Sequence, residues 1–131
     1  MNKLSVMVVD DDQLQLAITA KMLSALGVQR ILTASDALAA LAILEGPEPD
    51  PDLVLSDLSM PNTDGIEFLT CLSRHHYPGS IAIVSGMSPV ILEAASKLAR
   101  EYRLKLLGVL AKPLSLAALQ QLLIQAAPLE S

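Results

Sequence analysis

Short apolar runs alternate along the chain with longer stretches whose apolar residues recur every three or four positions. The runs are rich in valine, isoleucine and leucine, which is typical of strands buried on both faces of a parallel sheet. The stretches between them have helical spacing, and the first carries Leu14, Ile18, Met22 and Leu26 at every fourth position. The alternation predicts an α/β protein with strands at residues 4–9, 28–33, 53–56, 80–84 and 106–111.

Residues that favour helix ends divide these segments. Gly27 supplies a stop for the first predicted helix, and Gly46 followed by proline ends the second. We expect Ser35 to cap the second helix and Ser115 to cap the last. Ser88 precedes a proline at the first position of the fourth helix, which is a strong start signal. The second helix carries Leu38, Leu41 and Leu44.

Five strands and five helices predict a three-layer (βα)5 sandwich of the flavodoxin-like class, with a parallel sheet between two helical layers. Right-handed crossovers between parallel strands leave few topologies. We choose the strand order 2-1-3-4-5, which is borrowed from known doubly wound proteins rather than worked out from the chain. In this order the first and third strands are neighbours at the point where the strand order reverses.

Composition narrows the class of protein. The 131 residues are enough for one domain with a buried core, which we expect at residues 1–127, with 128–131 as a tail or truncated linker. No apolar run approaches the roughly 18–20 residues that cross a bilayer, so we expect no membrane association. The net charge of −5 argues against direct nucleic-acid binding. The single cysteine, Cys71, excludes an internal disulfide and fits a reducing cytoplasm.

Polar residues with complementary chemistry follow four of the five predicted strands. Asp10 and Asp11 follow the first strand, Asp57 the third, Ser85 the fourth and Lys112 the fifth. The carboxyl ends of parallel strands lie at one edge of the sheet, where open α/β sheets bind ligands. With the first and third strands adjacent, the three carboxylates are expected to meet.

Three converging carboxylates repel one another, and each unpaired one would have its pKa raised. A divalent cation removes this repulsion, and Mg²⁺ prefers one or two carboxylates together with waters and phosphate oxygens. We therefore expect Asp11 and Asp57 to bind Mg²⁺ directly and Asp10 to act through a water or to support the ligands. Ser59 is expected to contribute its backbone carbonyl.

The same residues suit phosphoryl transfer to a carboxylate. Ionised Asp57 is already a competent nucleophile at neutral pH, so the site needs mainly to position the phosphoryl group and neutralise its charge. Mg²⁺ would hold one phosphoryl oxygen, Lys112 a second, and the Ser85 hydroxyl with nearby backbone amides a third. Each residue alone has an ordinary explanation as a turn or capping residue. Four complementary strand ends together favour a phosphoacceptor site.

The order and spacing of these residues match a known family. The acidic pair Asp10-Asp11, the D-x-x-M-P-x-x-D-G stretch at 57–65, Ser85 and Lys112-Pro113 resemble the receiver domain of two-component response regulators, and the likeness spans about residues 6–124. The resemblance implies a regulatory switch that catalyses only its own phosphorylation and dephosphorylation. Asp57 would take a phosphoryl group from a histidine kinase or phosphotransfer protein, with Mg²⁺ required and the Lys112–Pro113 peptide cis.

Two differences from the usual receiver sequence affect how phosphorylation of Asp57 would be transmitted to an output. Receivers usually carry Tyr or Phe three residues before the lysine, where this chain has Val109, so the signal is expected to leave through strand 5 and its flanking helices. The longer segment between Ser85 and Lys112 is similar to receivers fused to EAL-type cyclic-di-GMP phosphodiesterases. The resemblance implies an output domain or downstream partner related to cyclic di-GMP, and it leaves homodimer formation open.

Two other classes of protein remain open from the sequence. A pseudo-receiver would share the fold but serve only docking or dimerisation, and the complete acid, hydroxyl and lysine set argues against it. A phosphatase of the haloacid-dehalogenase type would use the D-x-D pattern that begins at Asp10, with Asp10 as nucleophile. Such enzymes usually need a longer chain and a further acidic pair.

Overall fold

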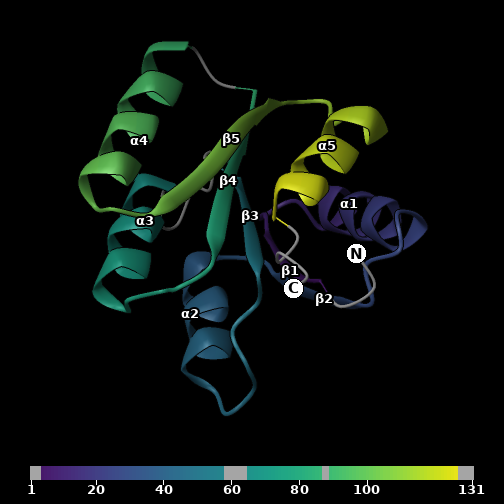
Figure 1. Cartoon of the computed structure of the whole chain (residues 1–131), viewed down its shortest axis with the longest axis horizontal. Coiled ribbons are helices and arrows are strands. Elements are labelled where there is room, and N and C mark those ends of the chain that lie inside the picture. Colours follow the sequence, from purple (N-terminus) through teal and green to yellow (C-terminus); the bar gives the residue numbers. More distant parts are fainter. Residues whose placement is uncertain (1–3, 58–64, 87–88, 127–131) are drawn as a thin grey trace.

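The computed structural model describes residues 4–57, 65–86 and 89–126, in which five strands and five helices alternate along the chain. The sheet lies between two layers of helices, as Figure 1 shows, so the predicted flavodoxin-like class is confirmed. None of the described helices is both long and apolar enough to span a membrane. The strands are β1 (Ser5–Val9), β2 (Arg30–Ala34), β3 (Leu53–Asp57), β4 (Ser80–Ser85) and β5 (Lys105–Ala111). The helices are α1 (Gln13–Ala25), α2 (Ala37–Glu45), α3 (Gly65–Arg74), α4 (Pro89–Glu101) and α5 (Leu116–Ala126).

The strand order is β2-β1-β3-β4-β5 with every pair parallel, so the order chosen from the sequence is confirmed. β1 and β3 are buried at every residue, as continuous apolar runs in a central parallel strand require. The edge strands β2 and β5 are largely half-buried or exposed. β4 is buried at every residue but its first, so the three interior strands are the most firmly packed part of the sheet.

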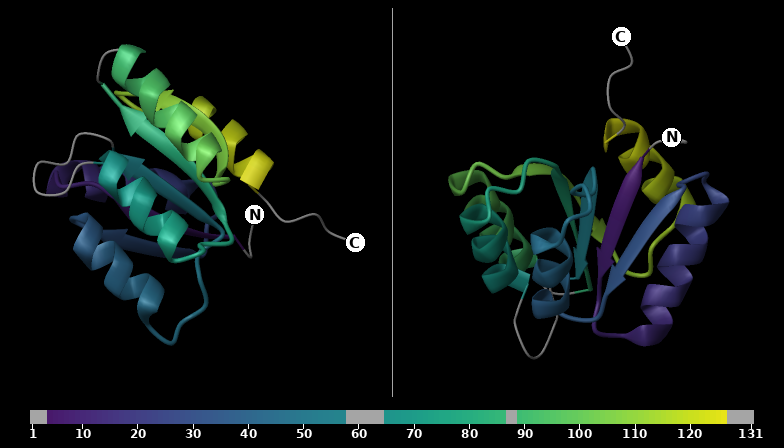
Figure 2. Two further views of the ribbon diagram at one scale, coloured as in Figure 1. Left: turned by 90° about the vertical axis from the view of Figure 1, so that its left-hand side faces the viewer. Right: turned by 90° about the horizontal axis from the view of Figure 1, so that it is seen from below.

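Successive residues of each central strand point to opposite faces of the sheet and build two separate cores. Met7 and Val54 pack on the side covered by α2, α3 and α4. Val8 and Leu55 pack on the side covered by α1 and α5. The two helical layers are seen on either side of the sheet in Figure 2. The core is aliphatic apart from Phe68 and Tyr77, both in the first of these clusters.

The four-residue apolar stripe predicted the presence of α1 but not the face that it buries. Leu14 and Ile18 are 67% and 43% exposed. An i, i+4 repeat advances about 400° in a helix that turns about 100° per residue, so the stripe drifts about 40° at each step. Such a stripe winds around the helix and cannot stay on one flat core. The residues that α1 buries are Leu16, Thr19 and Leu23.

The residue that caps α2 differs from the one predicted from the sequence. The cap of α2 is Asp36, not Ser35, and its carboxylate accepts a hydrogen bond at 2.7 Å from the backbone N–H three residues on. Both residue types make good caps, so their order alone could not decide which one starts the helix. The shift leaves Leu38 in the first turn of α2, 72% exposed. Ser115 caps α5 as predicted, at 3.1 Å, and Ser88 lies outside the described residues.

A hydrogen-bonded clamp closes the end of the sheet opposite the predicted site. The buried Tyr77 hydroxyl donates to the backbone carbonyl of Pro51 at 2.8 Å. Burial, followed by the nearby charges of Asp50 and Asp52, raises the pKa of Tyr77, which keeps the hydroxyl protonated as a donor. Asp52 in turn accepts the backbone N–H of Ser5 at 2.8 Å. The loop before β3 is thereby tied to β1 and to the segment before β4.

We predict that Gly79→Ala destabilises the fold at this clamp. A Cβ atom at position 79 would collide with the Tyr77 hydroxyl and lie 2.9 Å from the carbonyl oxygen of Asp52. Overpacking of this kind should lower the free energy of unfolding by about 1–3 kcal/mol, measured by urea denaturation followed by circular dichroism. Gly108→Ala is the matched control, because its Cβ would meet only Leu122 at 3.7 Å. Equal stability of the two variants would contradict the clamp.

Candidate metal and phosphoacceptor site

Two buried strands bring the predicted acids together at one edge of the sheet. Asp10 directly follows β1 and Asp57 ends β3. The two strands are paired so that Val9 lies beside Ser56, which puts the next residue of each strand side by side. Asp10 and Asp57 are only 5% and 4% exposed. Two carboxylates are thus held where they have little water to solvate them.

Asp11 completes a cluster of three carboxylates. Asp10, Asp11 and Asp57 each offer one oxygen, and these oxygens lie within 4.8 Å of one another. Asp11 is exposed while the other two are buried, so the cluster opens to solvent on one side. An all-oxygen donor set with a wet side fits a hard cation such as Mg²⁺, which usually keeps several waters.

Asp12 has a different task from the two acids before it. Its side chain caps α1 by accepting the backbone N–H groups of Leu14 and Gln15 at 2.9 and 3.2 Å. Its own N–H donates to Asp10 at 3.0 Å, which fixes one oxygen of that carboxylate. The three consecutive acids therefore divide into a buried acid, an exposed acid and a helix cap.

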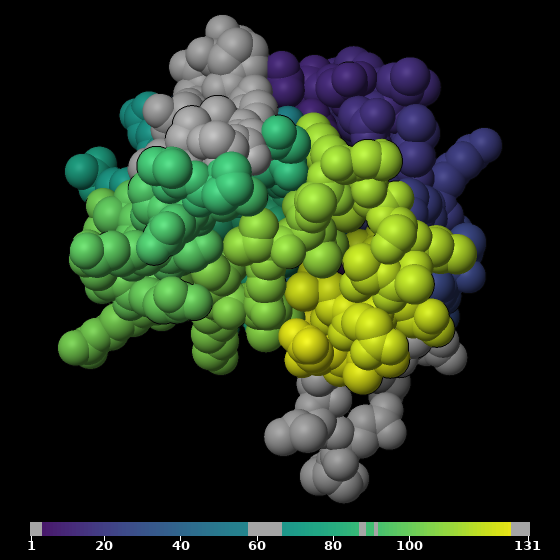
Figure 3. Space-filling view, turned by 90° about the horizontal axis from the view of Figure 1, so that it is seen from above, coloured from purple at the N-terminus to yellow at the C-terminus, as the bar shows by residue number. Residues whose placement is uncertain are grey.

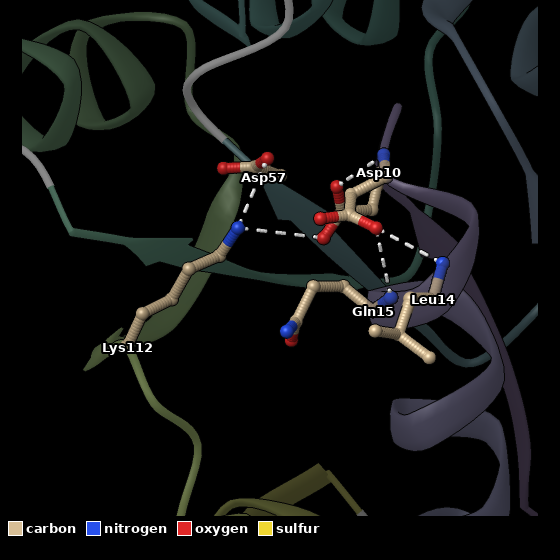
Figure 4. Close-up of polar contacts among 6 residues, drawn as sticks. Asp10, Leu14, Gln15, Asp57 and Lys112 are labelled. Atoms are coloured by element: carbon tan, nitrogen blue, oxygen red, sulfur yellow. Dashed lines mark hydrogen bonds and ion pairs between the residues drawn. The ribbon is translucent and has the colours of Figure 1, made fainter.

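Lys112 reaches the two buried carboxylates from the end of β5. Its Nζ lies 3.2 Å from Asp57 Oδ2 and 3.4 Å from Asp10 Oδ2, as Figure 4 shows. The side chain is 28% exposed, so the ammonium bridges the acids without being fully desolvated. The peptide bond to Pro113 is cis, as predicted.

The pKa values of these groups reflect burial and mutual contact. Burial raises the pKa of Asp10, and Asp57 adds to the rise, while the N–H of Asp12 and the Lys112 ammonium oppose it. Burial acts to lower the pKa of Lys112, but hydrogen bonding and attraction from Asp57 and then Asp10 outweigh it and raise the value. The lysine is therefore held in its charged form beside the acids.

Ser85 ends β4 next to the lysine-bearing strand. It is 2% exposed, its backbone pairs with Ala111, and its carbonyl accepts the N–H of Lys112 at 3.2 Å. β3 and β4 are also adjacent, with Asp57 opposite Val84. Asp57, Ser85 and Lys112 thus come from three neighbouring strand ends. Ser59 lies outside the described residues.

Two polar residues that the sequence interpretation did not single out lie at the same place. Gln15 and Thr19 of α1 line a small cavity together with Asp10, Asp57 and Lys112. Their spacing of four residues puts them on one side of the helix. The sequence therefore carried a signal for this pair, but on a different face of the helix from the apolar stripe that predicted α1.

Comparison with known proteins agrees with this arrangement. A family model described as the response regulator receiver domain matches residues 6–124. The cyclic di-GMP phosphodiesterase RocR of Pseudomonas aeruginosa is 32% identical over 123 residues, which are 94% of this chain and 31% of RocR. The chain therefore spans about a third of the length of this relative.

Solved receiver structures share the fold. A response regulator receiver domain protein from Clostridium thermocellum has a TM-score of 0.80 at 24% identity, with 94% of this chain and 93% of that chain covered. The signal receiver domain of an HD domain-containing protein from Pseudomonas fluorescens has a TM-score of 0.80 at 26% identity, with 95% and 94% covered. The chain belongs to the response regulator receiver domain family of two-component signalling. Domains of this family are regulatory.

We predict that Lys112→Met destabilises the protein in the absence of metal. The change leaves Asp10 and Asp57 buried together without their shared cation, and we expect a loss of about 1–2 kcal/mol at neutral pH, reduced from the value for a fully buried pair because the lysine is partly exposed. Losing the ammonium should raise the pKa of Asp10 further. An acid whose pKa is higher in the folded than in the unfolded state destabilises the folded state at pH values where the acid is ionised. The loss of unfolding free energy in Lys112→Met should therefore shrink as the pH falls.

Urea denaturation at pH 7 and at about pH 4 checks both parts of this prediction. Lys105→Met is the matched control, because Lys105 is an exposed lysine at the other end of the same strand. A loss that is equal for the two variants, or that grows on acidification, would contradict the proposed electrostatic role of Lys112.

Proposed function

We propose that Asp57 is the phosphoacceptor of this receiver domain. It would take a phosphoryl group from a histidine kinase or phosphotransfer protein in a Mg²⁺-dependent reaction. The observation that supports this most directly is a carboxylate with 5% of its side chain exposed, 3.2 Å from a lysine ammonium and grouped with two further acids. A carboxylate so placed lies close to compensating charge and belongs to a cluster that is open to solvent at Asp11.

We assign the acids different roles toward the metal. Asp11 and Asp57 would bind Mg²⁺ directly, together with the backbone carbonyl of Ser59. Asp10 would act through a water, because its oxygens already accept the N–H of Asp12 and the ammonium of Lys112. When bound, Mg²⁺ would supply neutralisation of the charge shared by the carboxylates and the phosphoryl oxygens.

The transfer itself needs little activation of the nucleophile. An oxygen of Asp57 attacks the phosphorus, a new P–O bond forms, and the donor's bond to phosphorus breaks with its electron pair leaving on the donor atom. Lys112 would give up its contact with Asp10 and donate to a phosphoryl oxygen. The hydroxyl of Ser85, at the adjacent strand end, would donate to another.

The output would leave by the face that α4, β5 and α5 form together. These three elements lie side by side in Figure 3, and β5 is the edge strand of the sheet. Val109 on β5 is 38% exposed and has no ring that could swing inward. A movement of Ser85 toward the phosphoryl group would be transmitted to the end of β5 through the hydrogen bond that the Lys112 N–H donates to the Ser85 carbonyl. The likeness to RocR favours a target related to cyclic di-GMP.

We predict that a small-molecule phosphodonor labels the wild-type chain only when Mg²⁺ is present, and that Asp57→Ala abolishes the label. The substitution removes the only oxygen proposed to attack phosphorus. Incorporation of labelled phosphate that hydroxylamine releases, as expected of an acyl phosphate, followed by mass spectrometry of the modified peptide, measures it.

Three outcomes separate the alternatives. Label that persists in Asp57→Ala would show that Asp57 is not the phosphoacceptor. A wild-type chain that takes no label, with a free energy of unfolding unchanged by Mg²⁺, would favour a pseudo-receiver; bound Mg²⁺ at ten times its Kd should instead add about 1.4 kcal/mol. Steady turnover of a phosphate ester that depends on Asp10 would indicate a phosphatase.

A protein phosphodonor must dock near the open side of the carboxylate cluster. Leu14 lies in the first turn of α1 and Ile18 one turn further on, and both are exposed apolar side chains that the core does not use. We propose that these two side chains form part of the surface on which the histidine kinase or phosphotransfer protein docks.

We predict that Ile18→Glu slows phosphorylation by the kinase at least about tenfold, because burying an apolar side chain of this size contributes about 1.5–3 kcal/mol. Phosphorylation by a small-molecule donor should not change. Leu38→Glu is the control, since Leu38 is also an apolar side chain exposed on a helix but lies on α2 across the sheet. Equal slowing with both kinds of donor would argue against docking on α1.

A further inference from the structure

A small cavity adjoins the carboxylate cluster, between the sheet and α1. Its volume is about 10 Å³, which is room for one water molecule. Asp10, Asp57 and Lys112 face it from the site. Beyond these three, the only polar side chains among the described lining residues are Gln15 and Thr19. The remaining lining residues are Val8, Val9, Leu55, Val84 and Leu114.

The ammonium of Lys112 has three N–H donors to satisfy. Its contacts to Asp57 and Asp10, at 3.2 and 3.4 Å, involve the two carboxylates that the proposed reaction alters. Phosphorylation turns one oxygen of Asp57 into the bridging oxygen of an acyl phosphate, and a cation among the acids competes for Asp10. With one N–H donated to a phosphoryl oxygen, the lysine still has two N–H groups for an acceptor that is independent of both acids and lines the same cavity.

Gln15 is suited to be that acceptor. Its backbone is fixed at the start of α1, where its N–H donates to Asp12 at 3.2 Å. Its side chain is half-buried and lines the same cavity as Lys112, and in Figure 4 its carboxamide bends away from the ammonium, so a rotation of the side chain would bring the two groups together. The carboxamide oxygen can accept from an ammonium and carries no net charge, so it adds nothing to the repulsion among the acids.

We propose that Gln15 is a positioning residue for Lys112. Its carboxamide oxygen, directly or through the one water that the cavity can hold, takes an ammonium N–H when Asp10 is engaged elsewhere. Lys112 is then held in line with the phosphoryl group on Asp57 instead of turning to solvent. This inference rests on the proposed phosphorylation of Asp57.

The test replaces Gln15 with methionine, which has a similar length and good helix propensity but no strong acceptor. At saturating Mg²⁺ and phosphodonor, we expect the maximal rate of Asp57 phosphorylation to fall about tenfold, the effect of losing one hydrogen bond to a charged group. The midpoint of unfolding and the Mg²⁺ affinity should stay near those of the wild type. Gln13→Met is the matched control, because Gln13 begins the same helix and is exposed.

A second readout does not depend on turnover. In protein loaded with Mg²⁺ and beryllofluoride, a phosphoryl mimic, the Lys112 ammonium should give a slowly exchanging ¹H–¹⁵N NMR signal. We expect this signal in the wild type, in Gln13→Met and in Gln15→Glu, which keeps an oxygen acceptor. It should be lost in Gln15→Met.

The outcomes are distinct. A wild-type rate together with a retained signal in Gln15→Met would overturn the inference while leaving Asp57 as the phosphoacceptor. An equal fall in Gln13→Met would also overturn it, because the effect would then belong to the helix start. A wild-type chain that takes no label on Asp57 would overturn the proposed function and this inference with it.

Discussion

Three carboxylates are crowded together at the point where the strand order reverses, and the chemistry of the site follows from their mutual repulsion. Asp10, Asp11 and Asp57 have oxygens within 4.8 Å of one another, and two of these residues are almost fully buried. Such a cluster is costly unless a cation offsets it. Lys112 offsets it in part from 3.2 and 3.4 Å. The remaining repulsion makes this edge of the sheet a place where added positive charge is strongly favoured.

The packing of the sheet separates a rigid part of the site from an adaptable part. β1 and β3 are buried along their whole length, so Asp10 and Asp57 are carried by the least deformable strands. Lys112 follows an edge strand that is mostly half-buried or exposed, and Val109 on that strand packs no ring against the site. A charge change at Asp57 can therefore move β5 more easily than β1 or β3. An output domain or partner can respond to phosphorylation only if it binds the two positions of β5 with different affinity. The size of the population shift is limited by that difference in affinity.

Much of the fold and of the acidic cluster could be predicted, because the signals were local. Each of Asp10, Asp57, Ser85 and Lys112 ends an apolar run, and the geometry of parallel strands then brings run ends to one edge. The buried face of α1 was not predicted, since a four-residue stripe winds around a helix instead of following one side. Gln15 was not singled out, because its spacing from Thr19 places both on one side of a helix but does not show that this side lines the same cavity as Lys112.

The alternation of strands and helices and the residue type at each strand end can be read directly from the chain, because both depend on short stretches of sequence. Tertiary structure alone decided which oxygens lie within 4.8 Å, which of Asp10, Asp11 and Asp12 is buried, exposed or used as a helix cap, and that Lys112 bridges two acids. It also decided that Leu14 and Ile18 face solvent while Gln15 lines the cavity. These facts depend on how α1 is rotated against the sheet, and that rotation is set by packing among residues far apart in the chain.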